Sequence, residues 1–256
     1  MDNIKVIILA AGKGTRMSES DNPMPKVLRE AHGKPLLSYA IDSASLLSLK
    51  PEDITIVVGY MKEMIIDRFN DQGYQFAIQD DGGYGTGYAV KCAVAQSNLD
   101  NFDGLVLVLQ GDVPLIKPET IKKLVAHNIE NRCACTLLSC ISQRQIPFGR
   151  IVRDENGEFE AIVEDKNCTP QQKLIRELNV GNYVFDARKL VCALDEIKVN
   201  SLSNELYLTD VPGIMRKNKE KVDAMPTTDE TELLGVNTFE DLKIIEEILD
   251  SRKQLS

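Results

Sequence analysis

The chain has 256 residues, of which 43% are hydrophobic, so it can bury the core of one large α/β domain. Its formal net charge of −9 argues against a general nucleic-acid binder, which would normally present a basic surface to phosphates. No apolar run approaches the roughly 20 residues that cross a bilayer, and residues 1–3 lead straight into a strand signal rather than a targeting segment. The six cysteines are scattered, which is typical of reduced thiols. We therefore expect a cytoplasmic protein with no membrane and no nucleic-acid partner.

The first strong signal is an apolar run over residues 6–9, which predicts a buried strand and breaks into a glycine-containing loop at residues 10–14. Glycines let backbone N–H groups turn toward a bound anion, and Arg16 and Lys26 can donate charge-assisted hydrogen bonds to phosphate oxygens. The loop lacks the Gly-Lys-Ser/Thr ending of a Walker-type P-loop. Met17 also stands where a dinucleotide fingerprint has its third glycine. Taken alone, this loop fits an ordinary α/β turn as well as a phosphate site.

Strand and helix signals alternate after this loop. Helices are predicted over residues 35–47 and 61–69, and strands over residues 54–58 and 74–78. This alternation is typical of right-handed crossover units in a parallel sheet. In such a sheet the ligand crevice is expected at the carboxyl ends of the strands.

A second glycine-rich loop follows the third of these strands and leads into a helix predicted over residues 88–95. Gln79 offers an amide that can pair with a pyrimidine edge, and the backbone at Gly85, Thr86 and Gly87 allows a flat base to approach closely. A flexible turn without a ligand is the alternative.

The most continuous strand signal covers residues 105–109 and is followed by Asp112. A carboxylate just beyond the tip of a central strand can bind a hard cation beside phosphates, which makes Asp112 a candidate metal ligand. An aspartate in a turn before Pro114 is the alternative.

The remaining signals are more β-rich. Cys133 and Cys135 could suggest a zinc site, but the alternation around them is typical of a strand, and only two histidines are available. The expected elements are a helix over 117–128, a strand over 133–141, a hairpin over 149–153 and 159–163 with an Asn-Gly corner, a strand over 177–185, and helices over 188–194 and 239–249.

The string LAAGKGTRM at residues 9–17, followed by PKVL at residues 25–28, resembles the signature of the nucleoside-diphosphate-sugar pyrophosphorylases. Within that family the chain is similar to the uridyltransferase domain of the bacterial N-acetylglucosamine-1-phosphate uridyltransferases. The resemblance implies a Rossmann-like α/β fold with a mixed, mainly parallel sheet flanked by helices and a small β-rich sugar-binding portion. It implies a transferase that joins a sugar 1-phosphate to UTP and releases pyrophosphate, giving UDP-N-acetylglucosamine, a cell-wall precursor.

The resemblance also assigns roles to residues of this chain. Arg16 and Lys26 would be catalytic, and Asp112 and Asn237 would hold Mg²⁺. The sugar would be contacted by Gly149, Glu164 and Asn179. The nucleotide would be bound by Leu9, Ala10, Ala11, Gly12, Gly14, Thr15, Gln79, Gly85 and Thr86.

Some positions depart from the family pattern. The loop after Gln79 is usually one residue shorter, contains a second glutamine and has histidine where Tyr88 stands, and Gln110 replaces a frequent tyrosine. The base preference is therefore less constrained than the reaction. A cytidylyltransferase for a polyol phosphate is one alternative, although such enzymes usually have glutamine at the position of Val27. A catalytically silent nucleotide-sugar sensor is another.

We expect one nucleotidyltransferase domain over residues 1–256, with a nucleotide-binding half at 1–130 and a sugar-binding half at 131–256. No hexapeptide repeats occur, so no C-terminal β-helix acetyltransferase domain is expected. Residues 204–210 resemble a family segment before a helix, and they could either cap that helix or contact the ligand. The expected partners are a nucleoside triphosphate and a sugar 1-phosphate, and the oligomeric state stays open.

Overall fold

The computed structural model describes residues 3–14, 17, 23–144, 146–201 and 203–254. Thr15 and Arg16, two of the expected site residues, lie outside the described residues.

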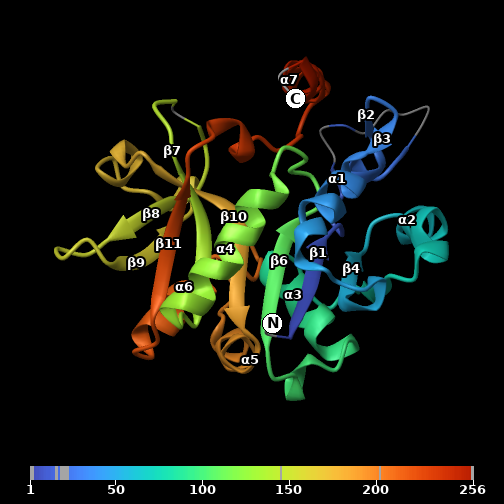
Figure 1. Cartoon of the computed structure of the whole chain (residues 1–256). Coiled ribbons are helices and arrows are strands. Elements are labelled where there is room, and N and C mark those ends of the chain that lie inside the picture. Colours follow the sequence, from blue (N-terminus) through green and yellow to red (C-terminus); the bar gives the residue numbers. More distant parts are fainter. Residues whose placement is uncertain (1–2, 15–16, 18–22, 145, 202, 255–256) are drawn as a thin grey trace.

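A nine-stranded sheet forms the centre of the described structure, with its main path in the order β11-β7-β10-β6-β1-β4-β5 (Figure 1). The strands from the first part of the chain are mutually parallel and have almost uninterrupted apolar sequences, as is typical of strands covered on both faces. They are β1 (Ile4–Leu9), β4 (Ile54–Val58), β5 (Gln75–Ile78) and β6 (Leu105–Gln110).

The second part of the chain adds antiparallel strands to the same sheet. β10 (Glu177–Asp186) runs antiparallel to β6 on one side and to β7 (Cys135–Ile141) on the other. β11 (Val222–Thr227) extends the sheet parallel to β7. The hairpin of β8 (Arg150–Arg153) and β9 (Phe159–Val163) branches from the first half of β10. The sheet is therefore mixed but mainly parallel where the expected nucleotide site lies, which confirms the expected fold class.

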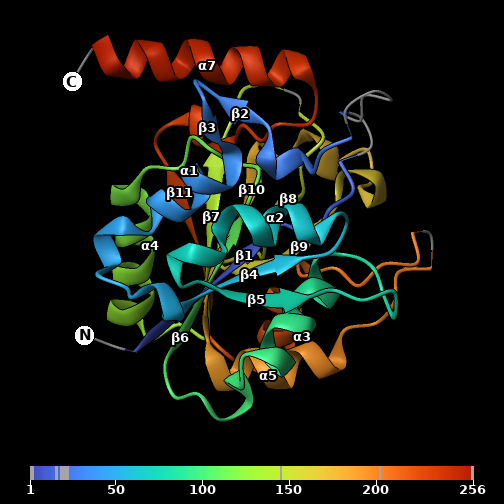
Figure 2. The same cartoon turned by 90° about the vertical axis from the view of Figure 1, so that its right-hand side faces the viewer.

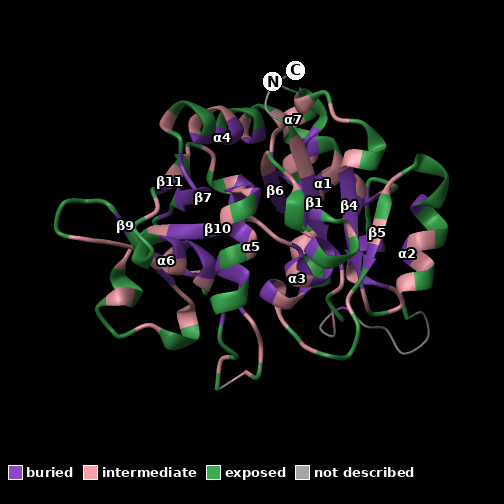
Figure 3. Ribbon diagram, turned by 90° about the horizontal axis from the view of Figure 1, so that it is seen from below, coloured by how far each residue is buried: buried purple, intermediate pink, exposed green. Residues whose placement is uncertain are grey.

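Helices cover both faces of the sheet (Figure 2). Val6 and Ile8 of β1 share an apolar cluster with α1 (Leu36–Ser43), α2 (Lys62–Phe69) and α4 (Pro118–Asn131). Ile7 and Leu9, which point to the opposite face, share a second cluster with α3 (Thr86–Gln96), α5 (Ala187–Glu196) and α6 (Asp210–Lys217). Figure 3 shows the buried strands between the more exposed outer sides of these helices.

α7 (Phe239–Gln254) lies across one end of the molecule, above the short hairpin of β2 (Glu30–Ala31) and β3 (Lys34–Pro35) (Figure 2). Only Ile245 of this helix is buried, and it packs in a third cluster with Leu36 and Leu115. No described helix is both long enough and apolar enough to cross a membrane.

The structure differs from the sequence expectations in a few elements. β11 and the β2–β3 hairpin were not predicted. The helix expected over 35–47 ends at Ser43 and continues as a 3₁₀ turn over Ser45–Leu47. The alternation around Cys135 does form a strand, and all six cysteines are free thiols.

Candidate active site

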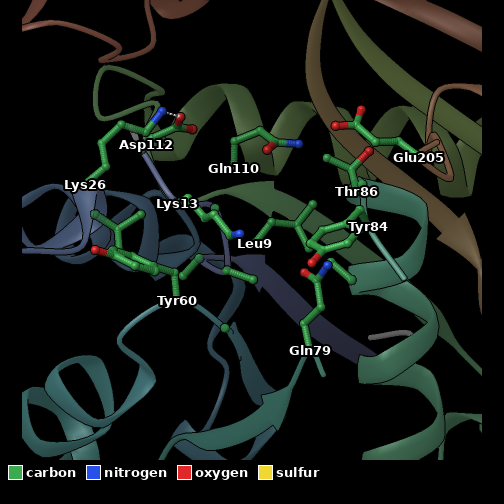
Figure 4. A pocket seen from close by; sticks show the side chains of 18 of the residues that line it. Leu9, Lys13, Lys26, Tyr60, Gln79, Tyr84, Thr86, Gln110, Asp112 and Glu205 are labelled. Carbon is green, nitrogen blue, oxygen red and sulfur yellow. Dashed lines mark hydrogen bonds and ion pairs between the residues drawn. The ribbon is translucent and has the colours of Figure 1, made fainter. Parts of the chain in front are cut away.

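A cavity of about 1140 Å³ opens where β1, β4, β5 and β6 end, the edge at which a parallel sheet is expected to bind ligands. Figure 4 shows side chains from several of these strand ends pointing into it. Its lining comes from both parts of the chain and consists of Leu9, Ala10, Ala11, Gly12, Lys13, Gly14, Lys26, Val27, Gly59, Tyr60, Lys62, Ile78, Gln79, Asp80, Asp81, Tyr84, Gly85, Thr86, Ala89, Gln110, Asp112, Glu164, Lys166, Glu205 and Tyr207.

The loop after β1 forms one wall of the cavity, and its four described nucleotide residues, Ala10, Ala11, Gly12 and Gly14, all line that wall together with Leu9 at the end of β1. The Ala10 N–H donates to the Val57 carbonyl at 2.9 Å, which continues the β1–β4 pairing into the loop. Gly14 has a φ of +56°, and a Cβ there would lie 2.7 Å from the Cβ of Lys26. The position therefore requires glycine both for its backbone conformation and for the close approach of Lys26.

The side chain of Lys26 contacts both of the expected metal ligands, Asp112 and Asn237. Its ammonium donates to the Asp112 carboxylate and, at 3.2 Å, to the Asn237 amide oxygen. Asp112 stands just beyond β6, and its carbonyl accepts from the Val236 N–H at 2.9 Å, so residues far apart in the chain meet here. The structure therefore brings Lys26, Asp112 and Asn237 together, although Asn237 itself does not line the cavity.

The donor set at this point fits a hard cation. The oxygens of Asp112 and Asn237 converge on a single ammonium group, so one cation can reach both. Mg²⁺ is commonly held by one or two carboxylates together with substrate phosphates. Among the described residues no group of three or more His, Cys, Asp or Glu side chains could hold a metal alone, so phosphate oxygens or water would complete the ligand set.

The second glycine-rich loop forms the opposite side of the cavity. The Gln79 N–H donates to the Val58 carbonyl at 2.8 Å, and its side-chain nitrogen lies 3.4 Å from the Gly83 carbonyl. Thr86 accepts a hydrogen bond from the Leu208 N–H at 3.1 Å. The expected residues Gln79, Gly85 and Thr86 therefore all line the cavity, but the Thr86 hydroxyl also anchors a segment from the second part of the chain.

Tyr88, one of the departures from the family pattern, organises this loop. Its hydroxyl donates to Asp80 Oδ1 at 2.6 Å, and the same oxygen accepts from the Gly82 N–H at 2.9 Å. The hydrogen bond with Asp80 raises the pKa of Tyr88 to about 12, and the hydrogen bonds from Tyr88 and Gly82 lower the pKa of Asp80.

Gln110, which also departs from the family pattern, lies at the end of β6, next to β10. Its side-chain nitrogen donates to the Gly181 carbonyl at 2.9 Å, and its own N–H donates to the Asn182 side chain at 3.2 Å. Gly181 has a φ of +92°, and the register of β10 against β7 shifts between Asn179 and Tyr183. Gln110 therefore spans this bulge and holds the two halves of the cavity together.

The three expected sugar residues are neighbours, but only Glu164 lines the cavity. A Cβ on Gly149 would lie 3.6 Å from the Cβ of Asn179 and 3.8 Å from Glu164 Oε2. Asn179 is buried, where it donates to the Tyr183 hydroxyl at 2.8 Å and accepts from the Gly181 N–H at 3.2 Å. In this structure Gly149 and Asn179 therefore support the wall behind Glu164 rather than face the cavity.

A hydrogen bond from residues 204–210, the segment expected either to cap a helix or to contact the ligand, orients the Glu164 side chain. The Thr209 hydroxyl donates to Glu164 Oε1 at 2.8 Å and makes no capping hydrogen bond to α6, although Thr209 occupies the N-cap position. Burial, with a contribution from the negative charge of Glu164, raises the pKa of Asp210. Glu205 and Tyr207 of the same segment line the cavity, which supports ligand contact over simple capping.

Several cavity residues were not proposed from the sequence. Lys166 lies with its ammonium 5.0 Å from the ring centre of Tyr207, and the hydrogen bond with the Tyr207 hydroxyl raises the Lys166 pKa. Tyr60 follows β4 by two residues, so the strand-end rule could have identified it. Lys13 lies within the glycine loop and could have been proposed with it, whereas nothing local marks Glu205.

Comparisons with known proteins agree with this architecture. The family described as "MobA-like NTP transferase domain" matches residues 6–181. The chain is 39% identical over 247 residues to the bifunctional protein GlmU of Clostridium perfringens strain ATCC 13124, and 39% identical over 246 residues to that of Streptococcus pyogenes serotype M1. Each alignment covers 96% of this chain and 52% of the relative, so the chain spans about half the length of these curated relatives.

Two solved structures share the fold. A Bacillus anthracis protein assigned as a glucose-1-phosphate thymidylyltransferase has a TM-score of 0.74 at 19% identity, covering 96% of this chain and 95% of that one. The 4-diphosphocytidyl-2C-methyl-D-erythritol synthase of Anaerococcus prevotii has a TM-score of 0.62 at 18% identity, covering 97% and 99%. These likenesses support the Rossmann-like fold alone. The family match covers most of the chain, so the resemblance seen in its motifs is confirmed, and the chain belongs to the MobA-like NTP transferase domain family.

Proposed function

We propose that this protein is a nucleotidyltransferase that joins N-acetylglucosamine 1-phosphate to UTP, giving UDP-N-acetylglucosamine and pyrophosphate. The observation that carries the proposal is the meeting of Lys26, Asp112 and Asn237 beside the loop of residues 10–14 in a large cavity. Two oxygen ligands and an ammonium group beside a glycine-containing loop suit the binding of a polyphosphate and its cation. The identity to the GlmU proteins supports the choice of substrates.

In the proposed reaction an oxygen of the sugar phosphate attacks the α-phosphorus of the triphosphate in line, and pyrophosphate leaves. The nucleophile is already an anion near neutral pH, so no general base is required. The chain has to bring two polyanions together and hold them in line. Lys26 would neutralise phosphate oxygens, and the backbone amides of residues 11–14 would surround the triphosphate. Arg16 has the same role in the proposal as Lys26.

Mg²⁺ would be held by Asp112 and Asn237, and when bound it would neutralise charge on the reacting phosphates. For that to happen the Lys26 ammonium must leave the two oxygens it contacts here and turn to the substrates. On the sugar side, the Thr209 hydroxyl donates to one oxygen of Glu164, which leaves the carboxylate as an acceptor for sugar hydroxyls. The six free thiols suit a reducing compartment, so the proposal places the protein in the cytoplasm.

The test is pyrophosphate release with Mg²⁺, with UTP, CTP, dTTP, ATP and GTP each paired with N-acetylglucosamine 1-phosphate, glucose 1-phosphate and methylerythritol phosphate. We expect release chiefly with UTP and N-acetylglucosamine 1-phosphate. Release with a different pair would keep the reaction class and replace the substrates. If the protein binds a nucleotide but releases no pyrophosphate with any pair, it is not a nucleotidyltransferase. That result would support the catalytically silent sensor, the alternative suggested by the altered loop at residues 79–88.

A further inference from the structure

Tyr84 is an exposed aromatic residue in the cavity with no role in the reaction described above. Tyr84 is 46% exposed and lies in the loop between β5 and α3. Figure 4 shows its ring and the amide of Gln79 both pointing into the cavity, on the side opposite Lys26 and Asp112. Loops at strand ends often carry function, and an aromatic ring offers a large flat face for contact with a ligand.

The backbone before Tyr84 is held by what we term the Asp80–Tyr88 latch, the hydrogen bonds from the Tyr88 hydroxyl and the Gly82 N–H to Asp80. A Cβ on Gly83 would lie 2.7 Å from the Tyr88 ring. Gly82 and Gly83 do not have positive φ angles, so their backbone conformation does not require glycine. Glycine is needed there because the Tyr88 side chain leaves no room for a Cβ.

The backbone after Tyr84 is held by the segment that carries Glu205 and Tyr207. The Tyr84 carbonyl accepts from the Leu206 N–H at 2.8 Å, and the Gly87 N–H donates to the Leu206 carbonyl at 2.9 Å. Gly85 lies so close that a Cβ on it would be 2.4 Å from the same carbonyl. Because the chain is held on both sides, the fold fixes the backbone position from which the Tyr84 side chain extends toward the cavity.

The ring presents a face to the cavity. The Lys13 ammonium lies over it, 5.6 Å from the ring centre, and Lys13 belongs to the expected phosphate loop. A cation–π contact at this distance near solvent is weak, on the order of 0.5 kcal/mol. A planar base would therefore displace Lys13 readily, and the released ammonium would be available to the phosphates of the same nucleotide.

We propose that Tyr84 is the platform on which the nucleobase of the bound triphosphate stacks. This inference rests on the proposed function. It assigns Tyr84 to affinity for the nucleobase and not to discrimination between different bases. Every base has a π-face, so stacking is tolerant of base identity. Selection among bases is then left to Gln79, whose amide can form directional hydrogen bonds.

The first experiment measures equilibrium binding of UTP, CTP and inorganic tripolyphosphate to the wild type, Tyr84→Phe and Tyr84→Leu. Tyr84→Leu should bind UTP and CTP about tenfold more weakly, with their ratio unchanged, because stacking is lost for both bases. Its affinity for tripolyphosphate, which has no base, should stay at the wild-type value. Tyr84→Phe keeps the ring and should bind all three ligands as the wild type does.

The second experiment uses fluorescence, because the chain contains no tryptophan. Tyr84→Trp introduces a single reporter at the proposed platform, and UTP should quench it whereas tripolyphosphate should not. Phe239→Trp is the matched control, because Phe239 is a half-exposed aromatic residue on α7 that does not line the cavity. Its fluorescence should respond to neither ligand.

Different results would overturn different claims. Wild-type UTP affinity in Tyr84→Leu would reject the platform, and an equal loss of UTP and tripolyphosphate affinity would show that Tyr84 acts through the phosphate loop instead. If the wild type binds UTP but releases no pyrophosphate with any sugar phosphate, the proposed reaction fails while a base-dependent Tyr84 effect still supports the platform. A wild type that binds no nucleotide rejects both.

Discussion

Lys26 is the residue at which three distant parts of the chain meet. Its ammonium contacts Asp112 and Asn237, and its Cβ fills the space that a side chain on Gly14 would need. In the proposed mechanism this ammonium moves from the two oxygens to the phosphates. Truncating a charged hydrogen-bond donor costs about 2 kcal/mol or more, which corresponds to about 30-fold in rate.

We expect Lys26→Ala to lower kcat/KM for pyrophosphate release by about 30-fold or more. Lys50→Ala, which removes an exposed lysine remote from the cavity, is the matched control and should leave the rate unchanged. An unchanged rate in Lys26→Ala would reject its role in phosphate neutralisation.

Asp112 should matter to turnover more than to folding. Its side chain is 25% exposed, so removing it leaves no large buried space. Asp112→Ala should abolish most pyrophosphate release at any Mg²⁺ concentration, while urea unfolding shows a free energy near the wild-type value. Near-normal activity of this variant with Mg²⁺ would show that the metal is held elsewhere.

At the scale of elements, the loop between β5 and α3 depends on its contact with residues 204–208. Gly85 has a φ of +95° and would meet the Leu206 carbonyl if it carried a Cβ, whereas Gly157 in the β8–β9 turn has a φ of +80° with nothing within 4 Å. The two glycines therefore share a backbone requirement and differ in their surroundings.

This pair gives a matched comparison of stability. Gly157→Ala should lower the free energy of unfolding by about 1 kcal/mol, the cost of a side chain in the left-handed region. Gly85→Ala should cost about 1–3 kcal/mol more, because the Leu206 backbone must also shift. Urea unfolding of both variants measures the difference. Equal losses would show that the loop can move away from residues 204–208 without cost.

Elements with strong local patterns were predictable from the sequence. The parallel strands have continuous apolar runs because both of their faces are covered, and the Asn156-Gly157 corner does form a turn, with the Gly157 N–H donating to the Asp154 carbonyl at 2.9 Å. β11 was missed because it contains Pro226 and lies at the sheet edge, where a missing N–H is tolerated. The β2–β3 strands have two residues each, too few for any periodicity.

The candidate site was predictable where function follows strand ends and glycine loops. Leu9 to Gly14, Gln79 and Asp112 all follow this rule, and all line the cavity. The expected contacts of Gly149 and Asn179 with sugar remain a prediction, because the hydrogen bonds of Asn179 to Tyr183 and Gly181 depend on a bulge that no local pattern reveals. Glu205 reaches the cavity through a long-range contact, in which the N–H of the next residue, Leu206, pairs with the Tyr84 carbonyl, and sequence periodicity does not encode such a contact.

At the scale of the whole molecule, residues after β11 close back onto the first part of the chain. Asp229 is central to this closure, since it accepts from Lys117 Nζ at 2.7 Å, from Arg252 of α7 at 3.1 Å and from the Thr231 N–H at 2.9 Å. Arg252 also donates to the Leu115 carbonyl at 2.8 Å. The same segment leads to Asn237 at the candidate metal site, so the closure and the site are built together.

The charge on Asp229 should make this closure sensitive to acid. Burial alone would raise the pKa of Asp229, but the hydrogen bonds from Lys117 and Thr231 outweigh it and hold the pKa well below its usual value of 3.8. A carboxyl group with a lowered folded-state pKa stabilises the protein above its unfolded pKa, and this stabilisation is lost as pH falls through the folded pKa. The loss should therefore begin near the usual aspartate value and continue below it.

Asp229→Asn should lower the free energy of unfolding by about 2 kcal/mol at neutral pH, because it removes the charge that Lys117 and Arg252 share. In urea unfolding across a pH series, the gap between wild type and variant should stay constant down to about pH 4 and shrink below it. Asp195→Asn, at a carboxylate that is 82% exposed, is the control and should show no comparable gap. A gap that persists unchanged into strong acid would mean that Asp229 stabilises the closure through its shape and neutral hydrogen bonds rather than its charge.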